Sequence, residues 1–450
     1  MNAARQLGEW VASVSEHEFP DDLLRKAADH LLDTLGAIVA GHDAPPARVA
    51  RAVFARPGPV PVVGRAETLD LRDAAYVHAV AAHSLEIDDT EGCDHSGAVV
   101  VPVLWSLLHG LRNDGGRTGA AHAAVFPAMI VGYEVGRRIQ LSLGGYEAHN
   151  AKGWHSTATC GVFAAAAAAA VLLGLDAEQT CAALGIAASA ASGTWVFAAD
   201  GAMTKQFHPG NAARAGLEAA LLTEHGASGP AEVFEDVWGG FLRVYGGADT
   251  SPETLLADLG SVWHFRHSAI KPYAACRSAH SAIDALRDIL DERGLHPDQI
   301  SLVRLHVSDF LRPMICPPAP RDAAQARMSL PVSAALLLEG AALMPDDFNA
   351  FDAPRVQTRL RRIEVVRDAD EHAEPLVEVH SANAIHRKRI AHARGGEESP
   401  LPSDEVRRKF SRLCDPILGE EATGRLTALV DELETSARRR GAPSEADPVV

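Results

Sequence analysis

A run of seven alanines, Ala164–Ala170, lies within an apolar stretch that extends from Gly161 to Leu173. Alanine is the residue that favours helix most strongly, so the run predicts a helix. Its side chains are so small that neighbouring elements must approach its backbone closely on all sides. The run therefore predicts a buried central helix in a chain built largely from helices.

Apolar residues recur at helical spacing along the part of the chain before residue 265. Asp21 can cap a helix whose core face includes Leu24, Leu31 and Leu35. Similar patterns predict helices at residues 69–84, 98–113, 118–142, 156–174, 177–192 and 210–226.

The pattern changes near residue 265. Strands are predicted by the alternation of Val303, Leu305 and Val307, of Ile363 with Val365, and of Val377 with Val379, and a further strand is expected around 384–391. Helical patterns at 279–293 and 324–340 lie among these strands, which indicates an α+β unit of about 130 residues. After Pro400 the chain returns to helical patterns at 404–414 and 420–438.

These changes predict a mainly α fold with an inserted α+β domain. The large helical domain is expected to form from both ends of the chain, residues 1–265 and 399–440, and the smaller domain from residues 266–398. Residues 441–450 are expected to be a disordered tail, because they contain few large apolar side chains.

Composition excludes several classes of protein. A formal net charge of −17 argues against a nucleic-acid or anionic-membrane partner, because such binding needs basic patches. The six cysteines include no Cys-x-x-Cys pair, which argues against a zinc site, an iron–sulfur cluster or a disulfide framework. The N-terminus lacks a signal pattern and the apolar runs are interrupted by charge, so we expect a cytoplasmic protein without membrane insertion.

Two segments place ionisable side chains among alanine and apolar residues. His155 stands just before the alanine-rich stretch, and Lys205 and His208 are bracketed by glycines and a proline. Burying such groups is costly unless they are paired, so they suggest chemistry. His155 is either a helix cap or an acid–base residue beside a carboxylate bound at that helix N-terminus. Lys205 and His208 are either loop residues or parts of the same site.

An acidic cluster precedes His95. Its members are Glu86, Asp88, Asp89, Glu91 and Asp94. It is a solvated loop, a site for a hard metal ion or part of an acid–base site. A terpene-synthase metal motif is excluded, because Gly92 stands where a third acid is needed and no second metal motif follows.

Five ordered blocks carry a resemblance to a known family. They are Leu85–Thr90 (LEIDDT) with His95–Ala98 (HSGA), Gly132–Arg138 (GYEVGRR), Gly153–Thr157 (GWHST), Thr204–Ala213 (TKQFHPGNAA) and Lys271–Ala285 (KPYAACRSAHSAIDA). In this order, over nearly the whole chain, they resemble the MmgE/PrpD family, whose members include a 2-methylcitrate dehydratase, a cis-aconitate decarboxylase and an iminodisuccinate epimerase. The resemblance implies a helical domain, a lid-like α+β domain and a homodimer.

The resemblance also implies a set of site residues. The catalytic candidates are His155, Lys205, His95, His280 and Glu86, and the substrate-binding candidates are Thr90, His208, Arg277 and Lys271. Without the resemblance, His280 is expected to be structural, as a lone histidine in a helix usually is. The chain departs from the family's decarboxylases at three points: Glu86 replaces an aspartate, the interval from Thr90 to His95 is shorter, and Val332 stands where those enzymes carry a site tyrosine.

The chemistry that suits these residues is proton transfer next to a carboxylate. Removing water from a 3-hydroxy acid needs a base for the α proton, positive charge for the enediolate and an acid for the leaving hydroxyl. We assign His155 to acid–base work, Lys205 and Arg277 to carboxylate binding, and His95 with Glu86 to the second proton transfer. His280 would close the pocket from the smaller domain.

The sequence therefore predicts a lyase without metal or other cofactor that acts on a di- or tricarboxylate, with dehydration as the first choice. Decarboxylation and epimerisation share the proton chemistry and remain alternatives. A carboxylate-binding protein without turnover is a further alternative.

Overall fold

The computed structural model describes residues 2–110, 118–317, 319–370, 373–382 and 384–440. Its α-helices are α1 (Ala3–Ala12), α2 (Asp21–Gly41), α3 (Pro45–Val53), α4 (Leu71–His83), α5 (Gly97–Gly110), α6 (Thr118–Ser142), α7 (Gly145–Ala151), α8 (Ser156–Thr159), α9 (Gly161–Leu173), α10 (Ala177–Ala188), α11 (Thr204–Glu224), α12 (Phe241–Tyr245), α13 (His280–Arg293), α14 (Arg312–Ile315), α15 (Ala323–Arg327), α16 (Leu330–Leu338), α17 (Pro354–Leu360), α18 (Ser403–Leu418) and α19 (Glu420–Arg440). Its strands are β1 (Val60–Pro61), β2 (Thr68–Leu69), β3 (Ile300–Val307), β4 (Ile363–Arg367), β5 (Leu376–Ser381) and β6 (Ile385–Arg389).

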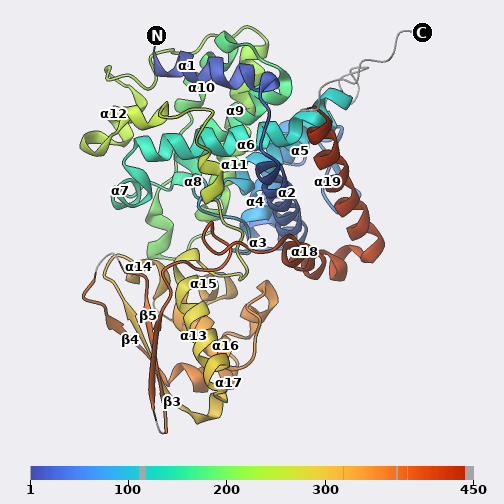
Figure 1. The fold of residues 1–450 in the computed structure, drawn as a ribbon. Helices are drawn as coiled ribbons and strands as arrows, with labels where there is room; N and C mark the ends of the chain where they lie inside the picture. Colours follow the sequence, from blue (N-terminus) through green and yellow to red (C-terminus); the bar gives the residue numbers. More distant parts are fainter. Residues whose placement is uncertain (1, 111–117, 318, 371–372, 383, 441–450) are drawn as a thin grey trace.

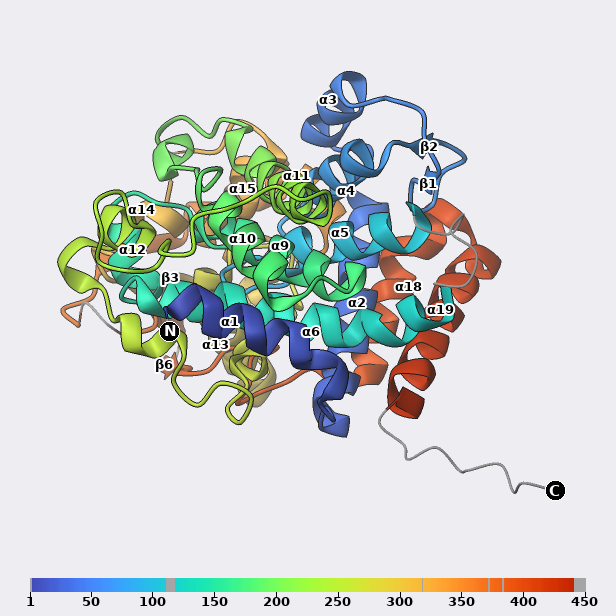
Figure 2. The same cartoon turned by 90° about the horizontal axis from the view of Figure 1, so that it is seen from above.

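Helix α9 is the centre of the helical part. Its alanines Ala164–Ala170 are at most 1% exposed, and α9 packs against α5, α6, α10 and α11, as the view from above shows (Figure 2). The predicted buried central helix is confirmed. The predicted helix at 156–174 is instead two helices, because the chain turns at Cys160 between α8 and α9.

Small residues on the neighbouring helices allow this close packing. A Cβ atom added to Gly216 of α11 would overlap Ala165 Cβ and the Val162 carbonyl oxygen, and one added to Gly132 of α6 would lie 2.9 Å from Ala164 O. Because the obstacles include backbone atoms, they cannot move aside as a flexible side chain would.

Replacing Gly216 by alanine is therefore expected to lower the free energy of unfolding by about 1–3 kcal/mol, the usual cost of overpacking a core. The matched control is Gly424→Ala in α19, where the added Cβ meets nothing within 4 Å. There alanine should raise the free energy of unfolding by about 0.5–1 kcal/mol through its higher helix propensity. Urea unfolding of both variants measures the difference, and equal stability would contradict the tight contact.

The sheet of the smaller part has the strand order β4-β3-β5-β6. Strand β3 runs parallel to β4 and antiparallel to β5, with Val303 opposite both Ile363 and Val379. Helix α13 packs against β5 and β6, and α16 packs against β4. In Figure 1 this sheet and helices α13–α17 lie together at one end of the molecule, below the helical part. The strands predicted from alternation are confirmed.

The C-terminal helices lie against helices from the start of the chain. Helix α18 packs on α2, and α19 packs on α6 and α2 (Figure 1). Lys409 of α18 donates to Asp33 Oδ1 of α2 at 2.5 Å and to the Ile87 carbonyl oxygen at 2.7 Å. The fold is thus mainly α with a smaller α/β part, and the exact domain boundaries stay a prediction. The predicted tail at 441–450 lies outside the described residues.

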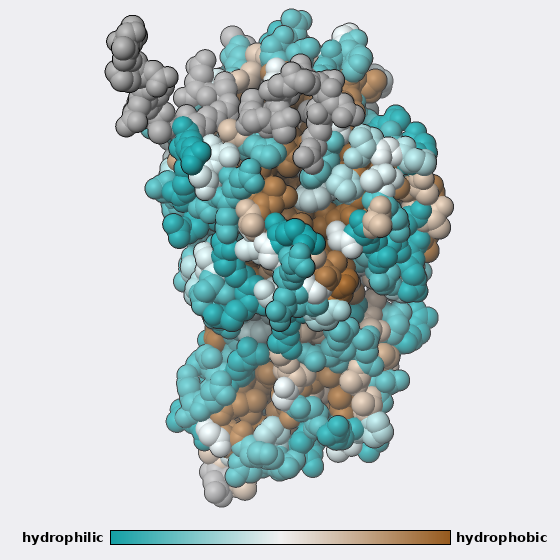
Figure 3. Space-filling view, turned by 90° about the vertical axis from the view of Figure 1, so that its right-hand side faces the viewer, coloured by the Kyte–Doolittle hydropathy of each residue, from teal (hydrophilic) through white to brown (hydrophobic). Residues whose placement is uncertain are grey.

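One described segment, Ser156–Leu173, is long and apolar enough to cross a membrane, but 94% of it is buried inside the fold. That burial is typical of a core helix. On the face shown in Figure 3 hydrophilic residues predominate, and apolar residues emerge between them in separate patches, as is normal for the surface of a folded protein.

Candidate active site

Lys205 and His208 lie in the first two turns of α11, which begins at Thr204 rather than at residue 210. An interior proline usually breaks a helix, so the sequence favours a helix that begins after Pro209. Here Pro209 lies inside the helix. Lys205 is only 5% exposed, which excludes the alternative of a surface lysine in a loop.

The acidic cluster forms a buried loop between α4 and α5. Glu86, Asp88, Asp89 and Asp94 are at most 6% exposed, so the alternative of a solvated loop is wrong. Glu86, Glu91 and Asp94 have φ angles of 55°, 63° and 90°, a left-handed conformation that costs about 1–3 kcal/mol for a residue with a side chain and concentrates at functional sites.

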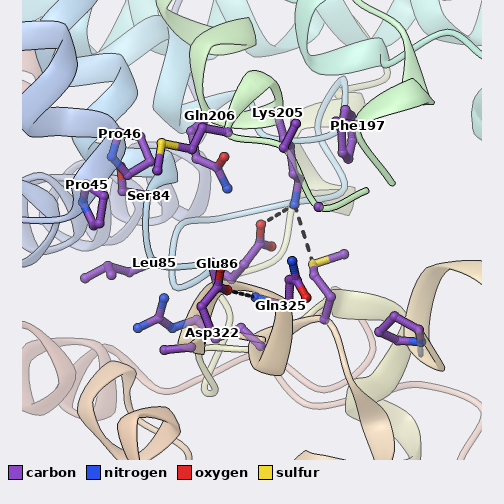
Figure 4. Close-up of a pocket in the computed structure, with 18 of the residues that line it drawn as sticks. Pro45, Pro46, Ser84, Leu85, Glu86, Phe197, Lys205, Gln206, Asp322 and Gln325 are labelled. Carbon is purple, nitrogen blue, oxygen red and sulfur yellow. Dashed lines mark hydrogen bonds and ion pairs between the residues drawn. The ribbon is translucent and has the colours of Figure 1, made fainter. Parts of the chain in front are cut away.

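Two lysines converge on Glu86. Lys205 Nζ forms an ion pair with Glu86 Oε1, and Figure 4 shows the two side chains pointing toward one another. Lys271 Nζ donates to Glu86 Oε2 at 3.3 Å and to the Glu86 carbonyl oxygen at 3.2 Å. Burial opposes ionisation of Glu86, but Lys205 and Lys271 outweigh it and hold the pKa of Glu86 well below 4.5. Burial likewise disfavours the Lys205 ammonium, but Glu86 outweighs it and raises the pKa of Lys205.

This ion pair borders a cavity of about 860 Å³. From the helical part, Ser84, Phe197 and Gln206 line it around Glu86 and Lys205. From the smaller part, Gln325, Arg327 and Met328 line it. A volume of this size suits a small-molecule ligand. The buried ammonium group of Lys205 therefore lies beside a cavity that a small carboxylate can enter.

Asp94 joins His95 and His155. Its Oδ1 lies 3.5 Å from His95 Nε2, and its Oδ2 lies 3.3 Å from His155 Nε2. Thr157 Oγ1 donates to Asp94 Oδ2 at 3.2 Å. Thr90 approaches Asp94 Oδ1 at 3.4 Å.

The two histidines have opposite pKa shifts. Burial, the largest influence, lowers the pKa of His155 below 6.5 despite the nearby Asp94 carboxylate. Burial also acts against protonation of His95, but the carboxylates of Asp94 and Asp88 outweigh it and raise the pKa of His95 above 6.5. His155 is therefore suited to accept a proton at neutral pH and His95 to donate one.

Asp88 holds two imidazoles from the other side. Its Oδ2 lies 2.8 Å from His83 Nδ1 and 3.0 Å from His95 Nδ1. Burial lowers the pKa of His83 to about 4, so this ring is neutral at pH 7. Asp88 thereby fixes the tautomer and orientation of both rings.

His83, Asp88 and His95 could also hold a metal ion, because one potential ligand atom from each lies within 4.8 Å of the others. However, His95 Nδ1 lies 2.8 Å from the Asp89 carbonyl oxygen, which can only accept a hydrogen bond. That nitrogen therefore carries a proton, and a protonated nitrogen cannot ligate a metal. The geometry favours a hydrogen-bonded proton-transfer group.

His208 supports His155. The two Nδ1 atoms lie 2.8 Å apart, and burial together with His155 lowers the pKa of His208 to about 3. His155 can donate its Nδ1 proton to the neutral His208, which leaves His155 Nε2, 3.3 Å from Asp94 Oδ2, able to accept a proton. His155 occupies the N-cap position of α8 without a side-chain capping bond, so the alternative of a helix cap is not supported.

Arg277 and His280 are held elsewhere in the structure. Arg277 Nε donates to Glu91 Oε1 at 2.8 Å, and Nη1 donates to the Arg394 carbonyl oxygen at 2.7 Å. His280 is fully buried with Nε2 3.1 Å from the Ala275 carbonyl oxygen. Of the predicted site residues only Glu86 and Lys205 line the described cavity. The predicted roles of Arg277 and His280 as carboxylate clamp and pocket closure would require these contacts to rearrange.

The sequence alone predicts no individual roles for His83, Asp88 and Asp94, and it does not indicate that Arg327 lines the cavity. Asp88 and Asp94 belonged to the acidic cluster, but the alternation of acids along a loop does not show which of them meets a histidine. His83 precedes that cluster at the end of α4, and its spacing from Asp88 was the only available signal.

Comparison with known proteins gives the family that the chain matches. Residues 5–253 match the model of the MmgE/PrpD N-terminal domain, and residues 273–435 match the MmgE/PrpD C-terminal domain. The chain is 28% identical to a cis-aconitate decarboxylase-like protein of Aspergillus oryzae over 468 residues, which cover 97% of this chain and 95% of that protein. It is 31% identical to a cis-aconitate decarboxylase of Aspergillus terreus over 310 residues, 67% and 62% of the two chains. It is 30% identical to the human cis-aconitate decarboxylase over 380 residues, 80% and 76% of the two chains.

Proposed function

Because the chain belongs to the MmgE/PrpD family, we propose that it is a lyase that moves a proton next to a carboxylate of a di- or tricarboxylate. The observation that carries the proposal is the buried group in which Asp94 joins His155 and His95, which is near enough to Lys205 for that ammonium to lower the pKa of Asp94 and of His155. Lys205, and not the histidines, lines the cavity. In the proposed reaction the group supplies a base and an acid, and Lys205 supplies positive charge.

Each of these residues has its own role in the proposed reaction. Neutral His155 takes the α proton, and Lys205 stabilises the negative charge that develops on the adjacent carboxylate. The substrate carboxylate replaces Glu86 as a partner of Lys205, while Lys271 keeps its contacts with Glu86. His95, whose pKa is raised by Asp94 and Asp88 against the effect of burial, donates a proton to the leaving hydroxyl.

Dehydration is the reaction that we propose first. Val332, in the first turn of α16, is 1% exposed and has no hydroxyl to donate, although family decarboxylases resembled by this chain carry a tyrosine there. Decarboxylation is the second candidate, because the relatives described above are named cis-aconitate decarboxylases. The proposal includes independence from metals and other cofactors.

Proton NMR in deuterated water separates these reactions. The protein, treated with a chelator and desalted, is incubated with 2-methylcitrate, citrate and cis-aconitate. Dehydration of citrate is expected to produce a vinyl proton signal, and dehydration of 2-methylcitrate is expected to convert its methyl doublet to a singlet on a double bond, in both cases without loss of a carboxylate. The substrate cis-aconitate is expected to give no itaconate. Rapid itaconate formation would favour decarboxylation. Activity that vanishes on chelation and returns with added divalent metal would contradict cofactor independence, and binding without any exchange or turnover would indicate a non-catalytic protein.

A further inference from the structure

Arg327, the last residue of α15, is a buried cation with no ion-pair partner among the described residues. It lines the cavity beside Lys205 and is 6% exposed. Its Nη2 donates to the Pro345 carbonyl oxygen at 3.1 Å, whereas its Nε has no hydrogen-bond partner. Among the described residues no carboxylate lies within ion-pair distance of its guanidinium. Its backbone is fixed, because Cys276 N donates to the Arg327 carbonyl oxygen at 3.0 Å.

The acids around the cavity attract Arg327 without pairing with it: burial lowers the pKa of Arg327, and Glu86, Asp346 and Asp322 only partly oppose this shift. Glu86 is already engaged by Lys205 and Lys271. Asp322 and Asp346 line the cavity but are exposed to water, and Asp322 accepts the capping bond from Gln325 N at 2.8 Å. A buried charge without a partner is costly, and arginine cannot escape the cost by losing its proton.

The buried charged side chains that line the cavity do not balance. Lys205 and Arg327 are two formal positive charges, and Glu86, which Lys271 also contacts, is one negative charge. The difference is one positive charge beside the cavity, which a carboxylate of a ligand can compensate. The remaining ionisable side chains that line the cavity are exposed: Asp43, Asp200, Arg321, Asp322 and Asp346.

We propose that Arg327 forms a second carboxylate subsite, which binds the substrate carboxylate remote from the reacting carbon while Lys205 binds the carboxylate next to it. This inference rests on the proposed function, whose substrates have at least two carboxylates, and assigns the residue that binds the second of them. The unpartnered Nε–H of a fixed guanidinium suits this task, because arginine recognises carboxylates through directed, charge-assisted hydrogen bonds. A monocarboxylate would leave Arg327 without a partner and should bind weakly.

The test uses tricarballylate, which has three carboxylates but no hydroxyl to eliminate, and butyrate as its monocarboxylate counterpart. Thermal unfolding and calorimetry measure binding to the whole protein and to the variants Arg327→Gln, Arg327→Lys and Arg321→Gln. Arg321 lines the same cavity but is exposed and donates to the Asp200 carbonyl oxygen at 2.5 Å, so it is the matched control.

The wild-type protein should be stabilised by tricarballylate and hardly by butyrate. Arg327→Gln should weaken tricarballylate binding at least about tenfold, the scale of a lost charge-assisted hydrogen bond. Arg327→Lys keeps the charge but loses the planar guanidinium, so its affinity for tricarballylate should lie between those of wild type and Arg327→Gln. Arg321→Gln should bind tricarballylate as tightly as wild type. Without ligand, Arg327→Gln should melt no lower than wild type, because it removes an unpaired buried charge.

The opposite results are distinguishable. A lower melting temperature of Arg327→Gln with unchanged tricarballylate affinity would show that Arg327 is only structural, and would overturn this inference alone. If Arg327→Gln does not fold, wild-type affinity in Arg327→Lys together with equal binding of butyrate and tricarballylate would overturn it. A wild-type protein that binds tricarballylate but turns over no acid would overturn the proposed lyase and leave the subsite standing. No response of wild type to any carboxylate would overturn both.

Discussion

Replacing His155 or Lys205 by alanine is expected to lower turnover by at least about a hundredfold, the usual contribution of a positioned acid–base group or of charge aimed at a developing anion. His155 is fully buried and joined to Asp94 and His208, so nearby water cannot readily take over its proton transfer. Lys205 is the buried ammonium that lines the cavity. Both variants should fold, because Lys271 continues to pair with Glu86 when Lys205 is lost.

Steady-state turnover on the substrate found by NMR measures these effects, with circular dichroism as the check on folding. The matched controls are His225→Ala and Lys152→Ala, which change an exposed histidine after α11 and an exposed lysine after α7. Both controls should keep normal activity. A folded His155→Ala or Lys205→Ala protein with turnover close to wild type would show that its assigned role is wrong.

Much of the fold could be predicted because local patterns determine it. The alanines of α9 and the alternation in β3 follow directly from small side chains and from the two-residue period of a strand. The predicted start of α11 at residue 210 is too late. The rule that proline ends a helix does not take into account the packing of α11, which holds Pro209 inside the helix. The break at Cys160 has no strong sequence signal, because serine, threonine and alanine on either side are compatible with one continuous helix.

The site was predictable only in part for a different reason. Family blocks placed Glu86, Lys205 and Lys271 in the site, and the structure joins them. The role of Asp94 depends on the approach of α8 to the loop before α5, which no local pattern encodes. Arg327 is notable only because it lacks a partner, and the absence of a partner is a property of the packed molecule rather than of the sequence.

The second large effect is expected from Asp94→Asn, which removes a charge and keeps the shape of the side chain. Burial lowers the pKa of His95, and Asp94 and Asp88 together raise it above 6.5. Without the charge of Asp94 the pKa of His95 should fall, because one of the two opposing carboxylates is gone. If protonated His95 donates to the leaving hydroxyl, activity declines as pH rises through the pKa of His95.

The alkaline limb of the pH profile should therefore move to lower pH in Asp94→Asn, and turnover at neutral pH should fall at least about tenfold, with a loss that grows as pH rises. Turnover as a function of pH measures this, and Asp249→Asn, at an exposed aspartate, is the control whose profile should not move.

The shape of the pH profile separates two roles of Asp94. If Asp94 only orients His155, the variant should show a uniformly lower profile with unchanged limbs, because orientation affects every pH equally. A displaced alkaline limb requires that the charge of Asp94 act on a titrating acid, and His95 is the histidine whose Nε2 faces Asp94 Oδ1 and whose pKa is raised.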